Sequence, residues 1–174
     1  MATHSLNGAG TYALVVGLDR SQDISIGRRG KFHFPAGFYV YVGSALGPGG
    51  VAARVARHLR PEKRLYWHID YLLGSRGARV VQVRAVESVA RLECEWARQA
   101  MRWIGARVVV PRFGASDCRC GAHLIGFDHL PDLTELTASR NCYAAASAGL
   151  TDPAVRWTSL RLDLSTQAEL LRAR

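Results

Sequence analysis

Long apolar runs are missing from this sequence, and none approaches the roughly 20 residues that a membrane-spanning helix needs. The first apolar stretch, residues 13–18, is short and has no basic segment before it, so we expect no signal peptide. Cysteine is also scarce, with 4 in 174 residues. This scarcity excludes a small secreted domain held together by disulfides, and we expect a cytoplasmic protein.

Lysine and acidic residues are few as well. Of the 23 basic side chains, only Lys31 and Lys63 are lysine, and the rest are arginine. Residues 1–127 hold 18 basic and 8 acidic side chains, whereas residues 128–174 hold 5 and 6. Arginine binds phosphate oxygens through two parallel hydrogen bonds, so the excess favours a polyanionic partner. A GC-rich genome would give the same composition, and composition alone does not separate the two interpretations.

The apolar share of the sequence, 48%, is enough for the core of one compact domain. Four segments with β-branched or aromatic residues are predicted to be strands, namely residues 11–18, 38–43, 80–86 and 108–110. Pro111 ends the last of them, because proline lacks the amide donor of a strand ladder. Between the first two strands we expect a small hairpin or an ordered loop over residues 19–37.

Other segments repeat apolar residues at helical spacing. Val51, Val55 and Leu59 predict a helix between a glycine-rich turn at residues 47–50 and Pro61. Further helices are expected over residues 67–73, from a cap at Ser88 to about residue 105, and over residues 165–173.

These elements predict an α/β fold class, with a small mixed or antiparallel sheet of three to four strands flanked by helices. We expect the folded domain to span residues 1–127 and a C-terminal extension to follow over residues 128–174. The boundary coincides with the end of the basic excess. The role of the extension is open at this stage.

Two pairs of side chains are suited to chemistry on a phosphate. Tyr12 and Tyr41, on neighbouring predicted strands, can bring two phenol groups to one surface. Arg54 and His58 lie four residues apart and so share a helix face, where a guanidinium can bind phosphate oxygens and an imidazole can move a proton. Taken singly, the two tyrosines are more typical of strand packing, and Arg54 and His58 are more typical of a solvated basic helix.

The later helix offers a carboxylate for a divalent cation, either Glu93 or Glu95. These two side chains are about 200° apart around the helix and so cannot share a face. Leu92 and Trp96 mark the buried side, and Glu95 neighbours that edge. A solvated helix charge is the alternative interpretation.

Together these elements resemble the GIY-YIG nuclease superfamily, in its Uri-type branch. The resemblance rests on Gly10-Thr11-Tyr12, Tyr41-Val42-Gly43, Arg54-Val55-Ala56-Arg57-His58 and Leu92-Glu93-Cys94-Glu95-Trp96-Ala97, and it covers about residues 9–127. One departure is the 29-residue separation of the two tyrosines, which requires residues 19–37 to be an insert that leaves the strands paired. Another is Ser44, where many relatives carry lysine.

The resemblance implies an endonuclease that hydrolyses phosphodiester bonds in DNA with one Mg²⁺ or Mn²⁺. Tyr12 and Tyr41 would position the attacking water and help to deprotonate it. Arg54 would stabilise the negative charge of the phosphate, and His58 would assist proton transfer or contact a phosphate. These roles agree with the charge that develops on phosphoryl oxygens during hydrolysis.

The same resemblance implies that Glu95 holds the metal ion, with Glu93 as the alternative ligand, and that Gly43 lets the backbone approach the substrate. The basic strip that follows Arg54 would track the nucleic-acid backbone: Arg57, Arg60, Lys63 and Arg64. Whether the DNA is single- or double-stranded is open, as is the oligomeric state. A non-catalytic nucleic-acid-binding module with the same fold is the alternative function.

A second cluster near the end of the predicted domain comprises Asp117, Cys118, Cys120 and His123. Thiolate and imidazole ligands suit Zn²⁺, although a Cys-x-Cys pair is unusual for one tetrahedral site and the fourth ligand is open. His129 is one choice for it. A structural or substrate-contacting loop and a redox role are the other interpretations.

Overall fold

The computed structural model of the protein describes residues 6–137 and 156–161. Its strands are β1 (Gly10–Leu18), β2 (Gln22–Ser25), β3 (Lys31–Phe34), β4 (Gly37–Ala45), β5 (Ala78–Glu87), β6 (Leu124–Phe127) and β7 (Arg156–Arg161). Its helices are α1 (Gly50–Leu59), α2 (His68–Leu73) and α3 (Glu93–Ala100), with short 3₁₀ turns η1 (Gly27–Arg29) and η2 (Leu133–Glu135). Within the described residues, no helix has both the length and the apolar character needed to cross a membrane.

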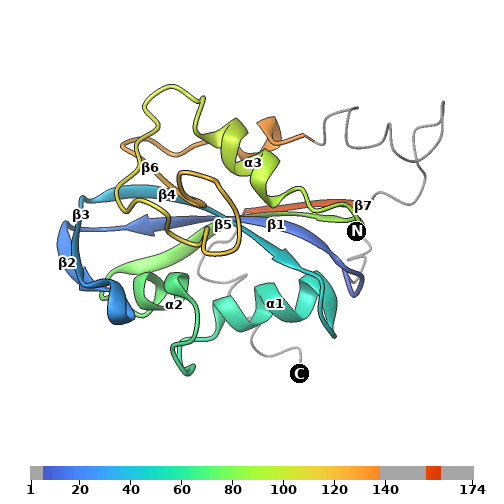
Figure 1. Cartoon of the computed structure of the whole chain (residues 1–174), viewed down its shortest axis with the longest axis horizontal. Coiled ribbons are helices and arrows are strands. Elements are labelled where there is room, and N and C mark those ends of the chain that lie inside the picture. Colours follow the sequence, from blue (N-terminus) through green and yellow to red (C-terminus); the bar gives the residue numbers. More distant parts are fainter. Residues whose placement is uncertain (1–5, 138–155, 162–174) are drawn as a thin grey trace.

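Five strands form one antiparallel sheet in the order β6-β4-β1-β5-β7, and β2 and β3 form a separate hairpin (Figure 1). The predicted α/β class, with an antiparallel sheet flanked by helices, is confirmed. The fifth strand comes from the C-terminal extension, where Trp157 pairs with Val86 of β5. Leu133 and Leu136 of the extension are also buried in the core. The domain boundary at residue 127 stays a prediction.

The strand predicted over residues 108–110 is wrong. In this part of the described chain, only an isolated bridge between Arg107 and Gly126 joins the sheet, and β6 takes the place of the predicted strand. Val110 is buried, but the backbone turns directly after it, where Arg112 has a φ of 60°. The short valine run therefore packs against the sheet as a loop.

The bounds of α3 also differ from the prediction. Ser88 does not cap this helix, because its hydroxyl accepts a hydrogen bond from the amide of Ala90 at 3.0 Å in a turn before the helix begins. The helix ends at Ala100 and is followed by turns up to Gly105, whose φ of 77° favours glycine. The helix predicted over residues 165–173 lies outside the described residues.

Alternation of side chains along the strands divides the core into two layers. Tyr12 and Leu14 of β1 point into a layer shared with α1, α2 and the β2–β3 hairpin, whereas Ala13 and Val15 point into a layer shared with α3. Figure 1 shows α1 and α2 on one side of the sheet and α3 on the other. Trp96 of α3 is completely buried in the second layer and anchors that helix to the sheet.

The segment between β1 and β4 is an insert that leaves these strands paired, as predicted. The register is unbroken from Gly10 opposite Ala45 to Leu18 opposite Gly37. The insert itself folds as the β2–β3 hairpin, in which Ile24 pairs with Phe32. The long separation of the two tyrosines is therefore compatible with close approach of their strands.

Candidate active site

Tyr12 of β1 and Tyr41 of β4 lie on the same face of the sheet. In the strand register Tyr12 is opposite Gly43 and Tyr41 is opposite Leu14, so the two tyrosines are diagonal neighbours with ring centroids 6.4 Å apart. Tyr12 is 2% exposed and Tyr41 is 8% exposed. Burial raises the pKa of both phenols above its ordinary value, so both are neutral at physiological pH.

Gly43 makes room for the Tyr12 ring. A Cβ atom at position 43 would lie 2.5 Å from the hydroxyl oxygen of Tyr12 and 2.7 Å from its Cζ. Any larger residue would push this ring from its place. Gly43 thus lets the Tyr12 ring lie close to the backbone of β4. A contact between Gly43 and a substrate stays a prediction.

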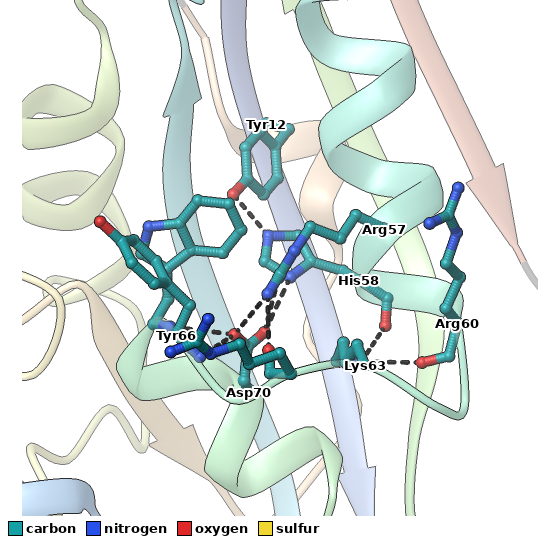
Figure 2. A network of polar contacts seen from close by, with 9 residues as sticks. Tyr12, Arg57, His58, Arg60, Lys63, Tyr66 and Asp70 are labelled. Carbon is teal, nitrogen blue, oxygen red and sulfur yellow. Dashed lines mark hydrogen bonds and ion pairs between the residues drawn. The ribbon is translucent and has the colours of Figure 1, made fainter.

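His58 of α1 packs against both tyrosines, with ring centroids 5.5 Å from Tyr12 and 6.1 Å from Tyr41. Its Nε2 lies 2.7 Å from the Tyr12 hydroxyl, and its Nδ1 lies 3.8 Å from Oδ1 of Asp70 (Figure 2). Burial lowers the pKa of His58 to about 3, although the charge of Asp70 acts in the opposite direction. The imidazole is therefore neutral at physiological pH, and Nε2 can accept a hydrogen bond from the Tyr12 hydroxyl.

Asp70 of α2 is completely buried and connects α2 to α1 through an ion pair with Arg57. Arg57 donates hydrogen bonds to both carboxylate oxygens, at 2.9 and 3.0 Å, and the amides of Tyr66 and Trp67 donate to Oδ2 at 2.9 Å. Burial alone would raise the pKa of this carboxyl, but the hydrogen bonds from Arg57 and the amides together hold it below its ordinary value. Asp70 is therefore a fixed negative charge behind His58.

Arg54 lies beside the tyrosine pair and is held by an aromatic ring. Its Cζ is 4.2 Å from the ring centroid of Trp67, and the Cζ of Arg57 is 4.1 Å from the same centroid. The positive charge of Arg54 acts to lower the pKa of Tyr12 and Tyr41, against the larger effect of burial. A guanidinium whose charge acts on both phenols in this way is suited to an anion bound between them.

The predicted basic strip separates into two kinds of residue. Arg57 is committed to Asp70, and Lys63 donates to the carbonyls of His58 and Arg60, at 2.8 and 2.9 Å (Figure 2). Arg60 and Arg64 are exposed. Among the described residues of the predicted strip, Arg60 and Arg64 are therefore the exposed members, and Arg57 and Lys63 are held by the hydrogen bonds above.

The two candidate carboxylates of α3 lie in different surroundings. Glu93 is 8% exposed. Burial contributes most to the raised pKa of Tyr12 and Tyr41, and the negative charge of Glu93 acts in the same direction. Within the part of the chain that the structure describes, the buried Oε2 of Glu93 has no hydrogen-bond partner. Glu95 accepts a hydrogen bond from Gln99 at 3.1 Å, on the opposite side of the helix. The charge of Glu93 therefore acts on the tyrosines, whereas Glu95 points to the other side of α3. Which of the two holds a metal ion stays a prediction.

The predicted thiol cluster gains a member from α3. A group whose ligand atoms all lie within 4.8 Å of one another, and which can hold a metal ion, consists of Cys94, Cys118, Cys120 and His123. None of the three cysteines forms a disulfide. Asp117 is exposed and is not part of this group. His129 is not part of it either, and its Nδ1 lies 3.0 Å from Oδ1 of Asp128.

Comparison with known proteins identifies the family to which the chain belongs. The model of a family described as "Domain of unknown function DUF123" matches residues 11–144. The chain belongs to the DUF123 family. No curated protein and no solved structure matches the chain. The segment shared with the DUF123 family contains both the tyrosine site and the thiol group, whereas β7 lies beyond it.

Some residues of this DUF123 site were not predicted from the sequence. Cys94 is far from Cys118 in the chain, so ligand spacing gave no signal for it, although it directly follows Glu93. Asp70 and Trp67 hold Arg57 and Arg54, but a buried carboxylate and a stacked ring look like ordinary helix residues in a sequence. Only the packing of α2 against α1 gives them a role at the site.

Proposed function

We propose that this DUF123 protein is a metal-dependent endonuclease that hydrolyses phosphodiester bonds in DNA, as its resemblance to the GIY-YIG nuclease superfamily implies. The supporting observation is that Tyr12, Tyr41 and His58 from β1, β4 and α1 pack together. The charges of Arg54 and Glu93 act on both phenols. Two phenols, a guanidinium, a neutral imidazole and a carboxylate are the groups needed to activate water, stabilise a phosphate and hold a cation.

Tyr12 and His58 act together on the attacking water. When the Tyr12 hydroxyl donates to Nε2 of His58, its oxygen lone pairs are free to accept a hydrogen bond from the attacking water. The neutral imidazole holds the phenol with these lone pairs directed at the water, which orients the water for attack. The negative charge of Asp70, 3.8 Å from Nδ1, makes the imidazole a stronger acceptor of this hydrogen bond.

Arg54 and Glu93 handle the charge of the phosphate. The guanidinium of Arg54 is placed to stabilise the negative charge that develops on the phosphate oxygens. Glu93 fits a divalent cation, because hard cations prefer carboxylate oxygens and its buried Oε2 has no hydrogen-bond partner among the described residues. A bound Mg²⁺ or Mn²⁺ would add Lewis-acid stabilisation of the same oxygens.

A cleavage assay with a matched pair of tyrosine variants tests the proposal. Purified protein is incubated with single-stranded, double-stranded and branched DNA and with RNA, in the presence of Mg²⁺, Mn²⁺ or a chelator. Tyr12→Phe removes the hydroxyl bound to His58 and is expected to lower the cleavage rate by about 10²-fold or more. Tyr39→Phe is the control, because Tyr39 is a buried tyrosine of the same sheet face whose hydroxyl donates to the carbonyl of Pro35.

The alternative function, a nucleic-acid-binding module without catalysis, predicts a different result. In that case wild-type protein binds DNA but cuts no substrate with either metal, and Tyr12→Phe leaves binding unchanged. Equal loss of cleavage in the Tyr39→Phe control would also contradict the proposal, because the effect would then come from the packing of the sheet.

A further inference from the structure

We propose that Cys94, Cys118, Cys120 and His123 bind one structural Zn²⁺ that fixes the start of α3 to the loop before β6. The four ligand atoms lie within 4.8 Å of one another. Three thiolates and one imidazole are a common ligand set of structural zinc sites, which use four protein ligands and leave no position for substrate.

The distances within the group agree with a tetrahedral zinc ion. Nε2 of His123 lies 3.8 Å from Sγ of Cys94 and 3.4 Å from Sγ of Cys118. Zinc–sulfur bonds of about 2.3 Å and zinc–nitrogen bonds of about 2.0 Å in a tetrahedron put a sulfur and a nitrogen ligand about 3.5 Å apart. The observed distances lie on either side of this value, so a zinc ion fits between the side chains with little movement.

The backbone around the cysteines is already held in a closed shape. Arg112 adopts a φ of 60°, which non-glycine residues adopt rarely, and its amide donates to the carbonyl of Gly121 at 2.5 Å. Its guanidinium donates to the carbonyls of Cys118 and Cys120, at 2.5 and 3.2 Å. Three thiolates around Zn²⁺ leave one net negative charge, which the adjacent guanidinium offsets.

A metal also explains the order of a long irregular segment. Residues 101–123, between α3 and β6, contain no helix and no strand, yet Val110, Phe113 and Ala122 within them are buried. Loops of this length are uncommon in compact domains without an additional constraint. Zinc would tie the two ends of this segment together, since Cys94 precedes it on α3 and His123 is its last residue.

The zinc site deepens the proposed function, and this step rests on that function. Glu93 and Cys94 are consecutive residues at the start of α3, so a ligand bond to Cys94 restrains the carboxylate beside it. At the other end, His123 lies against the tyrosine site, because its carbonyl accepts a hydrogen bond from the amide of Val42 at 2.9 Å. A Cβ atom at Gly114 would lie 3.2 Å from both the Cβ of His123 and the Cε2 of Tyr41. We infer that zinc positions Glu93 relative to Tyr41.

Metal analysis of the purified full chain tests the zinc site directly. We expect close to one zinc per chain in wild-type protein and a large loss of zinc in Cys94→Ser and Cys118→Ser. His129→Gln is the control and is expected to keep its zinc, because His129 is exposed and contacts Asp128 instead. Iron in place of zinc, or wild-type protein with no bound metal even after incubation with ZnCl₂, would overturn the proposal.

Two further measurements hold even if the cysteine variants do not fold. Wild-type protein stripped by a chelator is titrated with CoCl₂, and the visible absorption of thiolate-bound Co²⁺ is expected to saturate at one ion per chain. Limited proteolysis of the stripped protein is expected to cut within residues 101–123, and ZnCl₂ is expected to prevent this. No absorption and unchanged proteolysis would overturn the proposal.

The zinc result and the cleavage result are separable. If the protein holds zinc but cuts no nucleic acid, the zinc proposal stands and the nuclease proposal is wrong. If it cuts DNA with Mg²⁺ but holds no zinc, the nuclease proposal stands and the zinc proposal is wrong. If both are present, stripping zinc is expected to lower the cleavage rate at saturating Mg²⁺, and an unchanged rate would refute the positioning of Glu93.

Discussion

Glu93 and Glu95 offer a direct residue-level test of the metal site, because they stand on one helix and differ in what they face. Glu93→Gln keeps the shape of the side chain and removes its charge. We expect cleavage to fall by about 10²- to 10³-fold, because loss of a metal ligand removes several kcal/mol of stabilisation from the transition state. The assay is single-turnover cleavage over a range of Mg²⁺ concentrations.

Glu95→Gln is the matched control for this variant. Its carboxylate accepts from Gln99 on the other side of α3, so we expect activity within a few-fold of wild type, about the scale of a surface substitution. The reverse pattern, with activity lost in Glu95→Gln and kept in Glu93→Gln, would identify Glu95 as the metal ligand, as the resemblance implies.

His58 predicts how stability depends on pH. Burial holds its pKa at about 3, below the ordinary value of 6.5, so between these values the unfolded state binds more protons than the folded state. Stability therefore falls as pH drops from 6.5 towards 3, by up to about 1.4 kcal/mol per pH unit from this residue. Urea unfolding at pH 7 and at pH 4.5 measures the difference.

The variant that isolates this effect is His58→Gln, which keeps a hydrogen-bonding group for Tyr12 but does not titrate. We expect a smaller loss of stability between the two pH values than in wild type. Part of the loss persists, because burial also lowers the pKa of His68. A loss as large as that of wild type would show that His58 is not buried in its neutral form.

At the scale of elements, the Arg57–Asp70 pair is what joins α1 to α2. Asp70→Asn removes a completely buried charge whose partner keeps 24% of its side-chain exposure. We expect a loss of about 3 kcal/mol in the free energy of unfolding, the lower end for a broken buried pair. Urea or thermal unfolding gives the value.

Asp19→Asn is the control for that loss. Asp19 and Arg79 also form an ion pair, but both side chains are about half exposed, so we expect a change below about 1 kcal/mol. A loss in Asp70→Asn no larger than this would mean that the two helices are held by apolar packing rather than by the buried pair.

The sequence predicts elements well where one local signal decides them. The β-branched and aromatic run of β4 and the apolar stripe of α1 both lie within a few residues of their predicted bounds. Residues 108–110 have a strand-like composition, but pairing with β6 is limited to the bridge between Arg107 and Gly126, and the backbone turns at Arg112. β7 was missed, since its pairing with β5 depends on a contact across a long stretch of chain.

The candidate site follows the same rule. Tyr12 and His58 are predicted by their motifs, and the structure joins them by a hydrogen bond. The choice between Glu93 and Glu95 depends on the rotation of α3 about its axis, which the buried position of Trp96 sets only once the sheet is formed. Cys94 belongs to the thiol group for the same reason, because no local spacing connects it to Cys118.

At the scale of the whole molecule, the basic excess predicts how DNA binding responds to salt. The charge lies within residues 1–127, and Arg60 and Arg64 are exposed at the end of α1 and in the turn after it. Each phosphate contact contributes about 0.9 to the slope of log affinity against log salt concentration on duplex DNA. We expect the double variant Arg60→Ala, Arg64→Ala to reduce this slope by about 2, measured by fluorescence anisotropy.

The control is the double variant Arg76→Ala, Arg79→Ala, at the other end of the sheet. Arg79 pairs with Gly17 of β1, whereas the site is built around Tyr12 near the start of that strand. We expect these substitutions to leave the slope unchanged. Equal reductions in both double variants would mean that DNA binds without preference for the candidate site.

The pairing of β7 with β5 has a consequence for how this family is studied in isolated pieces. The shared DUF123 segment ends at residue 144, before β7 begins. A fragment cut at that point would present the long edge of β5 as a row of open backbone donors and acceptors, the surface on which chains join edge to edge into aggregates. The backbone of the C-terminal strand therefore occupies an edge on which other chains would otherwise pair.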